Sequence, residues 1–196
     1  MITDNGEAEL KLFGAHNMMN IYGAQLVCKQ LGISQKDFYA SVASFEGTAN
    51  RLELVLSNGN GRFYKDFAHA PSKVGATVKA VREQFPDMNF VACLELHTFS
   101  SLNKKFISEY QGALDSPDHA CVYYNEHTLS MKRLPPLNSK DVNEAFSRGD
   151  MKVIVTSKDI VSWLTKIKEP NTVYLMMSSG NFDGLNFNEL ATQLLS

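Results

Sequence analysis

From Arg62 onward the chain alternates short apolar segments with longer amphipathic ones. The short segments predict strands over Arg62–Phe67, Asn89–Leu96, Ala120–Tyr124, Lys152–Val155 and Val173–Met177. The longer segments predict helices over residues 71–85, 102–114, 139–147, 158–167 and 186–195. Strands that alternate with helices favour a mostly parallel, doubly wound sheet. We therefore expect an α/β protein whose binding loops follow the strand ends at one edge of the sheet.

A β-hairpin is expected just before this pattern. The sequence Asn58-Gly59-Asn60-Gly61 is a strong turn signal, because Asn and Gly tolerate the positive φ angles of tight hairpin turns. It joins Leu52–Leu56, a segment of alternating polarity, to the returning strand that begins at Arg62. The sheet should therefore open with an antiparallel pair.

Two helices are expected upstream of the hairpin, over residues 17–31 and 35–43, without a sheet of their own. Gly32 ends the first of them as a C-cap. The following segment, Phe45–Thr48, has the composition of a linker. We therefore expect residues 1–46 to be the tail of a truncated neighbouring domain and residues 47–196 to be an α/β domain of ordinary size.

The composition argues against several classes of protein. The 196 residues are 44% hydrophobic and carry a net charge of −2, which gives no electrostatic footprint for nucleic acid. No apolar run reaches membrane-spanning length, and the acidic N-terminus is unlike a signal peptide. Cys28, Cys93 and Cys121 form no CxxC motif, and the last two lie in expected strands, where a thiol is a small core residue. We expect a cytoplasmic protein with neither a nucleic-acid nor a membrane partner.

The segment Gly14–Asn20 carries two amides at the start of the first expected helix. Asn17 and Asn20 are three residues apart, so both face the same way on a first helical turn. An amide offers a donor beside an acceptor, which matches the edge of a flat heterocycle such as adenine. Asn residues at a helix start also serve as caps, and this simpler interpretation stands beside the first.

Two further segments carry side chains suited to a nucleotide. Asp66 ends a strand ahead of His69 and Pro71, and a carboxylate there can accept from both hydroxyls of a ribose. The alternative is that Asp66 caps the loop and His69 lies on the surface. Arg51 opens a strand after the glycine linker, and its guanidinium suits phosphate or ribose oxygens. The alternative for Arg51 is a surface ion pair with Glu53 or another acid.

Three motifs, taken in order, resemble the ATP-dependent Mur ligases of peptidoglycan synthesis. They are GAHNMMN at residues 14–20, FEG and RLE within residues 45–53, and DFAHAP at residues 66–71. The resemblance extends over most of the chain. It implies that a central ATPase domain ends with the first motif and that a Rossmann-like C-terminal domain follows. The sequence LMMSSGNFDG at residues 175–184 is similar to a loop of the branch that recycles muropeptides, with the L-alanine-adding branch as the near relative.

The resemblance implies an amide ligase that joins UDP-N-acetylmuramate to a cell-wall peptide or amino acid through an acyl phosphate. It implies nucleotide contacts at His16, Asn17, Asn20, Arg51, Asp66 and His69. It implies substrate contacts, in the loops after two later strands, at His97, Thr98, Ser100, Ser178, Ser179 and Asn181. ATP and Mg²⁺ would be bound mostly by upstream domains of the same protein, over which this domain would close.

Several features of the family are absent from the sequence. It contains no G-x-x-x-x-G-K-[ST] phosphate loop and no cluster with metal-ligand spacing, so we expect no catalytic residue and no metal site in this fragment, and no activity of the fragment alone. The resemblance implies an arginine that pairs with a substrate carboxylate, but no arginine lies between Arg82 and Arg133. Lys104 or Lys105 would have to take its place. Lys65 stands where some relatives have a second Asp. A free-standing nucleotide- or effector-binding module and a protein-interaction domain are the alternative functions.

Overall fold

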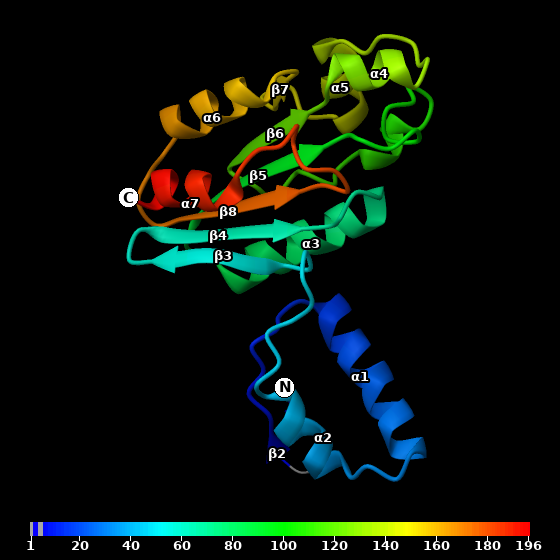
Figure 1. Cartoon of the computed structure of the whole chain (residues 1–196), viewed down its shortest axis with the longest axis vertical. Coiled ribbons are helices and arrows are strands. Elements are labelled where there is room, and N and C mark those ends of the chain that lie inside the picture. Colours follow the sequence, from blue (N-terminus) through cyan, green and yellow to red (C-terminus); the bar gives the residue numbers. More distant parts are fainter. Residues whose placement is uncertain (1, 4–5) are drawn as a thin grey trace. The chain divides into compact units, whose positions relative to one another are not determined.

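The computed structural model describes residues 2–3 and 6–196, which form two compact units (Figure 1). The first unit extends to Ala49, and the second runs from Asn50 to Ser196. The division follows directly after the linker-like segment of the sequence. The assignment of residues 1–46 to an ATP-binding domain stays a prediction.

The second unit contains one sheet of six strands in the order β3-β4-β8-β5-β6-β7. The strands are β3 (Glu53–Asn58), β4 (Gly61–Asp66), β5 (Asn89–Glu95), β6 (His119–Tyr123), β7 (Lys152–Ile154) and β8 (Thr172–Met177). The pair β3 and β4 is the expected antiparallel hairpin, whereas all other neighbours in the sheet are parallel. The predicted α/β fold with a mostly parallel, doubly wound sheet is confirmed.

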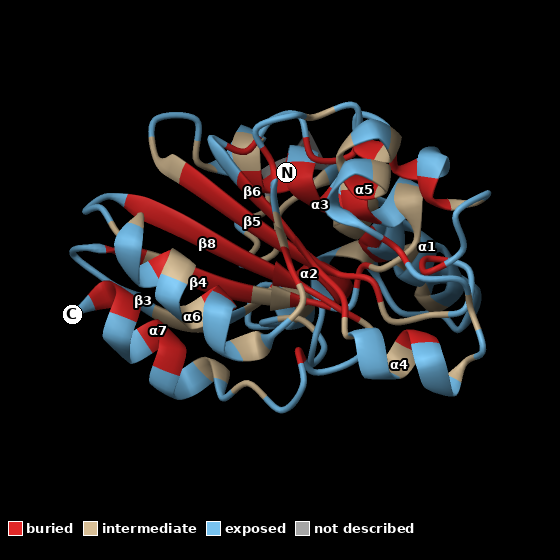
Figure 2. Cartoon of the chain, turned by 90° about the horizontal axis from the view of Figure 1, so that it is seen from above, coloured by how far each residue is buried: buried red, intermediate tan, exposed pale blue. Residues whose placement is uncertain are grey.

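Helices cover both faces of this sheet, and its central strands are buried (Figure 2). They are α3 (Pro71–Gln84), the 3₁₀ helix η1 (Ile107–Tyr110), α4 (Glu126–Met131), α5 (Ser139–Phe146), α6 (Ser157–Lys166) and α7 (Phe187–Leu195). Cys93 and Met176 belong to a core cluster with Leu164 of α6 and Leu194 of α7. Strands β5 and β8 are buried on both faces, which explains why their sequences are apolar almost throughout.

Two cysteines face each other across neighbouring strands. Cys93 of β5 is the register partner of Cys121 of β6, and both are free and buried. The prediction that they are core residues is confirmed. Burial raises the pKa of the Cys121 thiol, which keeps it protonated and therefore weakly nucleophilic.

The prediction of a helix over residues 102–114 is wrong, because the structure has turns and the 3₁₀ helix η1 there. The Oδ1 of Asn103 accepts a hydrogen bond from the backbone N–H of Lys105 at 2.9 Å. Such local side-chain bonds compete with helix formation. Gly112, with a φ of 77°, interrupts the other end of the segment. Helix α4 was not predicted; its N-terminus is capped by the Asn125 side chain, which accepts from two backbone N–H groups.

The first unit contains two helices and a short strand pair. They are α1 (Ala15–Gln30), α2 (Gln35–Val42), and the antiparallel β1 (Ile2–Thr3) and β2 (Gly6–Glu7). The expectation that these helices lack a sheet is therefore wrong. The sequence did not reveal the strand pair because strands of two residues are too short to show alternating polarity. Ile21, Phe38 and Tyr39 form a small core. Within residues 2–3 and 6–196, no helix is long and apolar enough to cross a membrane.

Candidate functional site

The loops that carry most of the predicted site residues lie side by side at one edge of the sheet. Strands β4, β8 and β5 are consecutive in the sheet and parallel, so their C-terminal ends meet at the same edge (Figure 1). The backbone N–H of Ser178 donates to the backbone oxygen of Asp66 at 3.0 Å, which joins the first two loops directly. This is the edge at which doubly wound sheets place their ligands.

Asp66 is a buried carboxylate at the end of β4. Its Oδ2 accepts from the Leu52 N–H at 2.7 Å, and its Oδ1 accepts from the Ala68 N–H at 2.7 Å. The Thr77 hydroxyl of α3 is a longer third donor at 3.4 Å. The alternative role of Asp66, as a cap of its own loop, is therefore present in the structure. A contact with ribose stays a prediction, and it would use the acceptor capacity that remains on the two oxygens.

The segment before β3 is held in an unfavourable backbone conformation. Asn50 and Leu52 have φ angles of 59° and 44°. Asn tolerates this region, but it costs a leucine roughly 1–2 kcal/mol. Hydrogen bonds compensate: the Asn50 oxygen accepts from the Phe67 N–H at 2.7 Å, and the Leu52 N–H is bound to Asp66. Arg51 lies between these two fixed residues, so its backbone position is fixed as well.

Arg51, Phe67 and His69 form a stack beside Asp66. The guanidinium carbon of Arg51 lies 5.5 Å from the centre of the Phe67 ring, and the Phe67 and His69 rings meet edge to face at 5.1 Å. The Nδ1 of His69 donates to the Phe67 backbone oxygen at 2.8 Å. The alternative for Arg51 was an ion pair with Glu53 or another acid, but Glu53 binds the Nζ of Lys65 at 3.0 Å, and no acid of the described residues is within ion-pair distance of Arg51. The structure thus brings together three predicted nucleotide residues, Arg51, Asp66 and His69.

The other three predicted nucleotide residues lie in the first unit. Helix α1 begins after Gly14, and no side chain caps it, so the interpretation of the Asn residues as N-caps is wrong. The Nδ2 of Asn17 instead donates to the backbone oxygen of Phe13 at 2.9 Å. His16 is half-buried and Asn20 is exposed. A contact of these side chains with adenine stays a prediction.

Glu95 connects the two loops of predicted substrate residues. This carboxylate ends β5, is only 4% exposed, and accepts hydrogen bonds from the Ser178 hydroxyl and, at 2.8 Å, from the Phe182 N–H. Its Oε1 lies 3.6 Å from the Nδ1 of His97. The structure therefore brings His97 and Ser178 together through Glu95, which the sequence placed at the start of the substrate loop but which was not among the predicted site residues. An acid at the end of an otherwise apolar strand is the signal that could have identified it.

The loop after β8 is tightly wound against Glu95. The Ser178 Oγ accepts from the Gly180 N–H at 2.6 Å. A Cβ atom at Gly180 would lie 2.9 Å from the Glu95 Oε2 and 3.0 Å from the His97 ring, which explains the glycine. The Asn181 Oδ1 accepts from the Gly184 N–H at 3.1 Å, and the Ser179 Oγ is buried without a partner among the described residues.

The loop after β5 is closed by its own hydroxyl groups. The Thr98 Oγ1 lies 2.9 Å from the Ser101 Oγ and 3.1 Å from the exposed Ser100 Oγ. Ser101, which sequence reasoning did not select, also accepts from the Thr98 N–H at 3.0 Å. The hydroxyl, amide and imidazole groups of these loops can bind a zwitterion or a peptide.

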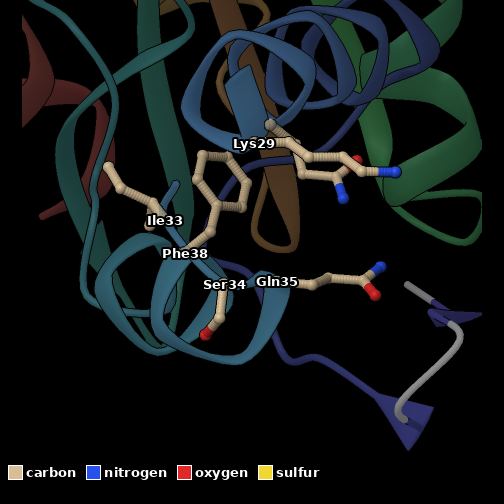
Figure 3. Close-up of a pocket in the computed structure, with 6 residues that line it drawn as sticks. Lys29, Ile33, Ser34, Gln35 and Phe38 are labelled. Carbon is tan, nitrogen blue, oxygen red and sulfur yellow. The ribbon is translucent and has the colours of Figure 1, made fainter. Parts of the chain in front are cut away.

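Lys104, one of the two lysines expected to pair with a substrate carboxylate, is already bound to Asp141 at 2.6 Å. Among residues 2–3 and 6–196, no three His, Cys, Asp or Glu side chains are grouped as metal ligands would be. A pocket of about 230 Å³ lies between α1 and α2, and none of the predicted site residues lines it (Figure 3).

Comparison with known proteins identifies relatives for nearly the whole chain, although no protein-family model matches it. The UDP-N-acetylmuramate–L-alanine ligase of Desulfitobacterium hafniense (strain Y51) is 25% identical over 178 residues, which cover 90% of this chain and 39% of that protein. The chain is related to the Mur ligases. It spans about two fifths of the length of this curated Mur ligase.

Solved Mur ligase structures share the fold. The UDP-N-acetylmuramate–alanine ligase of Thermotoga maritima superposes with a TM-score of 0.69 and 17% identity, over 89% of this chain and 37% of that one. The murein peptide ligase of Psychrobacter arcticus superposes with a TM-score of 0.65 and 21% identity, over 95% of this chain and 38% of that one. The resemblance to the Mur ligases that the sequence motifs predicted is confirmed.

Proposed function

We propose that this chain is the C-terminal part of an ATP-dependent ligase that joins UDP-N-acetylmuramate to a cell-wall peptide. The reaction is the one used in muropeptide recycling, with L-alanyl-γ-D-glutamyl-meso-diaminopimelate as the peptide. ATP, when bound, would supply the γ-phosphoryl group that converts the muramate carboxylate to an acyl phosphate, with ADP as the leaving group. The peptide amine then displaces phosphate and forms the amide bond. We further propose that the protein works in the cytoplasm.

One observation carries the proposal: the group of Arg51, Asp66 and His69 lies next to the group of Glu95, His97 and Ser178. Asp66 ends β4, Ser178 follows β8 and Glu95 ends β5, three consecutive strands of the sheet. The Ser178 N–H binds the Asp66 backbone oxygen. A ligase needs its activated carboxylate and its attacking amine within a few ångström of each other. A guanidinium and a carboxylate suit the nucleotide, and the imidazole and hydroxyl groups beside them suit the amine substrate.

The first unit supports a longer protein. Five large apolar side chains of α1 and the turn that follows it are exposed: Met19, Tyr22, Leu26, Val27 and Leu31. Exposed apolar side chains gathered on one element commonly mark a contact surface. We propose that upstream domains of the same protein cover this surface. In this proposal, residues 1–46 belong to the ATP-binding domain and Asn17 and Asn20 contact adenine. The phosphates and Mg²⁺ are bound mainly by those upstream domains.

The test is product formation by the native gene product. The protein is incubated with ATP, Mg²⁺, UDP-N-acetylmuramate and the tripeptide, and products are followed by mass spectrometry and by phosphate release. The proposal expects UDP-N-acetylmuramyl tripeptide and phosphate in equal amounts. A native gene product of only 196 residues, or no phosphate release with any acceptor, would contradict it.

Addition of L-alanine is the second candidate function. It is favoured by the name of the Desulfitobacterium hafniense relative and of the Thermotoga maritima structure. The same assay with L-alanine in place of the peptide separates the two. Exclusive use of L-alanine would replace the recycling reaction by this one. Nucleotide binding without any ligation would favour a free-standing nucleotide-binding module.

A further inference from the structure

The loop after β5 meets a lysine from the end of α4. The Nζ of Lys132 lies 4.4 Å from the centre of the Phe99 ring. Phe99 comes two residues after His97, and its side chain is 61% exposed. Lys132 follows α4, which itself follows β6, the neighbour of β5 in the sheet. This cation therefore lies at the same sheet edge as the predicted substrate residues.

The backbone that carries Phe99 and the backbone that carries Lys132 are both held by hydrogen bonds. The Thr98 and Ser101 hydroxyl groups close the loop on either side of Phe99. The Lys132 N–H donates to the Thr128 oxygen at 3.0 Å, and the next turn is closed by the Leu134 N–H on the Leu129 oxygen, also at 3.0 Å. A lysine at a helix C-terminus is favoured by the helix dipole. The ammonium group is thus held near Phe99 although the side chain itself is long.

No carboxylate in the described part of the chain lies within ion-pair distance of the Lys132 ammonium group. By contrast, Lys104 is bound to Asp141 and Lys140 to Glu144. An aromatic face holds a cation without neutralising it. Lys132 can therefore bind an external anion, which Lys104 can do only by giving up Asp141.

We propose that Lys132, held against Phe99, binds a carboxylate of the acceptor that is remote from the attacking amine. The inference rests on the proposed ligase function and sharpens it. In a single amino acid the amine and the carboxylate share one carbon, but in an extended tripeptide the two ends are up to about 10 Å apart. His97 follows β5, whereas Lys132 follows α4, which comes after the neighbouring strand β6, so the two groups belong to separate loops. An amine near His97 and a carboxylate on Lys132 therefore suit a peptide better than L-alanine.

The experiment compares KM values for each substrate of the native gene product. Phosphate release is measured while the acceptor, ATP and UDP-N-acetylmuramate are varied in turn, with the tripeptide and its carboxyl-amidated form as acceptors. The variants are Lys132→Ala and Lys132→Arg, with Lys79→Ala as the control, since Lys79 is an exposed lysine of α3 paired with Glu83. We expect Lys132→Ala to raise the acceptor KM roughly ten-fold and to abolish the preference for the free acid over the amide. Lys132→Arg should keep that preference, and Lys79→Ala should change nothing.

Each other outcome overturns the inference in a distinguishable way. An acid preference that survives in Lys132→Ala would exclude Lys132 as the carboxylate site. A raised KM for ATP or UDP-N-acetylmuramate, with an unchanged acceptor KM, would assign Lys132 to a phosphate instead. Wild-type turnover with L-alanine alone would contradict the inference and leave the ligase function standing. No wild-type turnover with any acceptor would overturn the proposed function, and the inference with it.

Discussion

The hydroxyl of Ser178 donates a hydrogen bond to the buried carboxylate of Glu95, and this contact joins the loop after β8 to the end of β5. The same Glu95 oxygen accepts from the Phe182 N–H, and the other lies 3.6 Å from His97. One carboxylate therefore fixes both loops of the proposed acceptor site. Hydrogen bonds from these donors offset the free-energy cost of burying the Glu95 carboxylate, because a buried charge is tolerated only when it is hydrogen-bonded.

Replacing Glu95 should destabilise the fold in proportion to the acceptors that are lost. Glu95→Ala leaves Ser178 and the Phe182 N–H unpaired, so we expect the free energy of unfolding to fall by about 2–4 kcal/mol in urea denaturation. Glu95→Gln keeps one acceptor oxygen and should cost about half as much. Glu144→Ala, at an exposed site of α5, is the control and should change stability by less than about 0.5 kcal/mol. Equal effects of Glu95→Ala and the control would mean that this carboxylate does not hold the loops.

Gly180 should not tolerate a methyl group. The new Cβ would lie 2.9 Å from the Glu95 Oε2, and Glu95 cannot turn away without losing its donors. We expect Gly180→Ala to lower the free energy of unfolding by about 1–3 kcal/mol. Gly149→Ala is the matched control, since nothing lies within 4 Å of a Cβ there. Comparable thermal unfolding of the two variants would argue against the tight packing of this loop.

Replacing Asp66 should raise the KM for ATP more than the KM for the acceptor. Asp66→Asn removes the charge that accepts from the Leu52 and Ala68 N–H groups and that is proposed to contact ribose. In the native gene product we expect the ATP KM to rise roughly ten- to hundred-fold, with little change in the acceptor KM. Asp115→Asn, at an exposed position, is the control. An unchanged ATP KM together with reduced stability would leave Asp66 with its structural role alone.

Tyr110 should ionise only at very high pH. Burial raises its pKa to about 12, and its hydroxyl donates to the backbone oxygen of His69. Because the folded pKa lies above the ordinary value, the stability from this neutral hydroxyl is complete below about pH 10 and is lost as pH rises toward 12. NMR titration of the Tyr110 ring carbon, assigned with Tyr110→Phe, measures this directly. A midpoint near pH 10 would contradict the burial of this hydroxyl beside the His69 loop.

The sequence predicts the sheet well because its signals are local. The Asn58–Gly61 turn and the apolar strands β5 and β8 each depend on a short stretch of residues. The prediction of a helix over 102–114 failed because the Asn103 side chain bonds to the nearby backbone and Gly112 has a positive φ. Helix α4 is only six residues long, which is too short for a periodic pattern.

The candidate site was predicted in part for the same reason. Arg51, Asp66 and His69 stand in motifs, and His97 and Ser178 follow strand ends, so sequence position alone points to them. The connection made by Glu95 and the contact of Lys132 with Phe99 depend on side chains brought together from separate loops. The conformation of Leu52, with a positive φ at a buried leucine, is likewise imposed by Asp66 across 14 residues of chain.

The most direct test of the account is a separation of KM values in the native gene product between Arg51→Ala and His97→Ala. Phosphate release is measured with ATP varied at saturating acceptor, and then with the acceptor varied at saturating ATP. If the two neighbouring loops bind the nucleotide and the amine substrate, Arg51→Ala should raise the ATP KM roughly ten-fold and His97→Ala should raise the acceptor KM by a similar factor, each leaving the other KM within about two-fold of wild type. Variants that change both KM values equally, or neither, would contradict the assignment of these loops to two substrates.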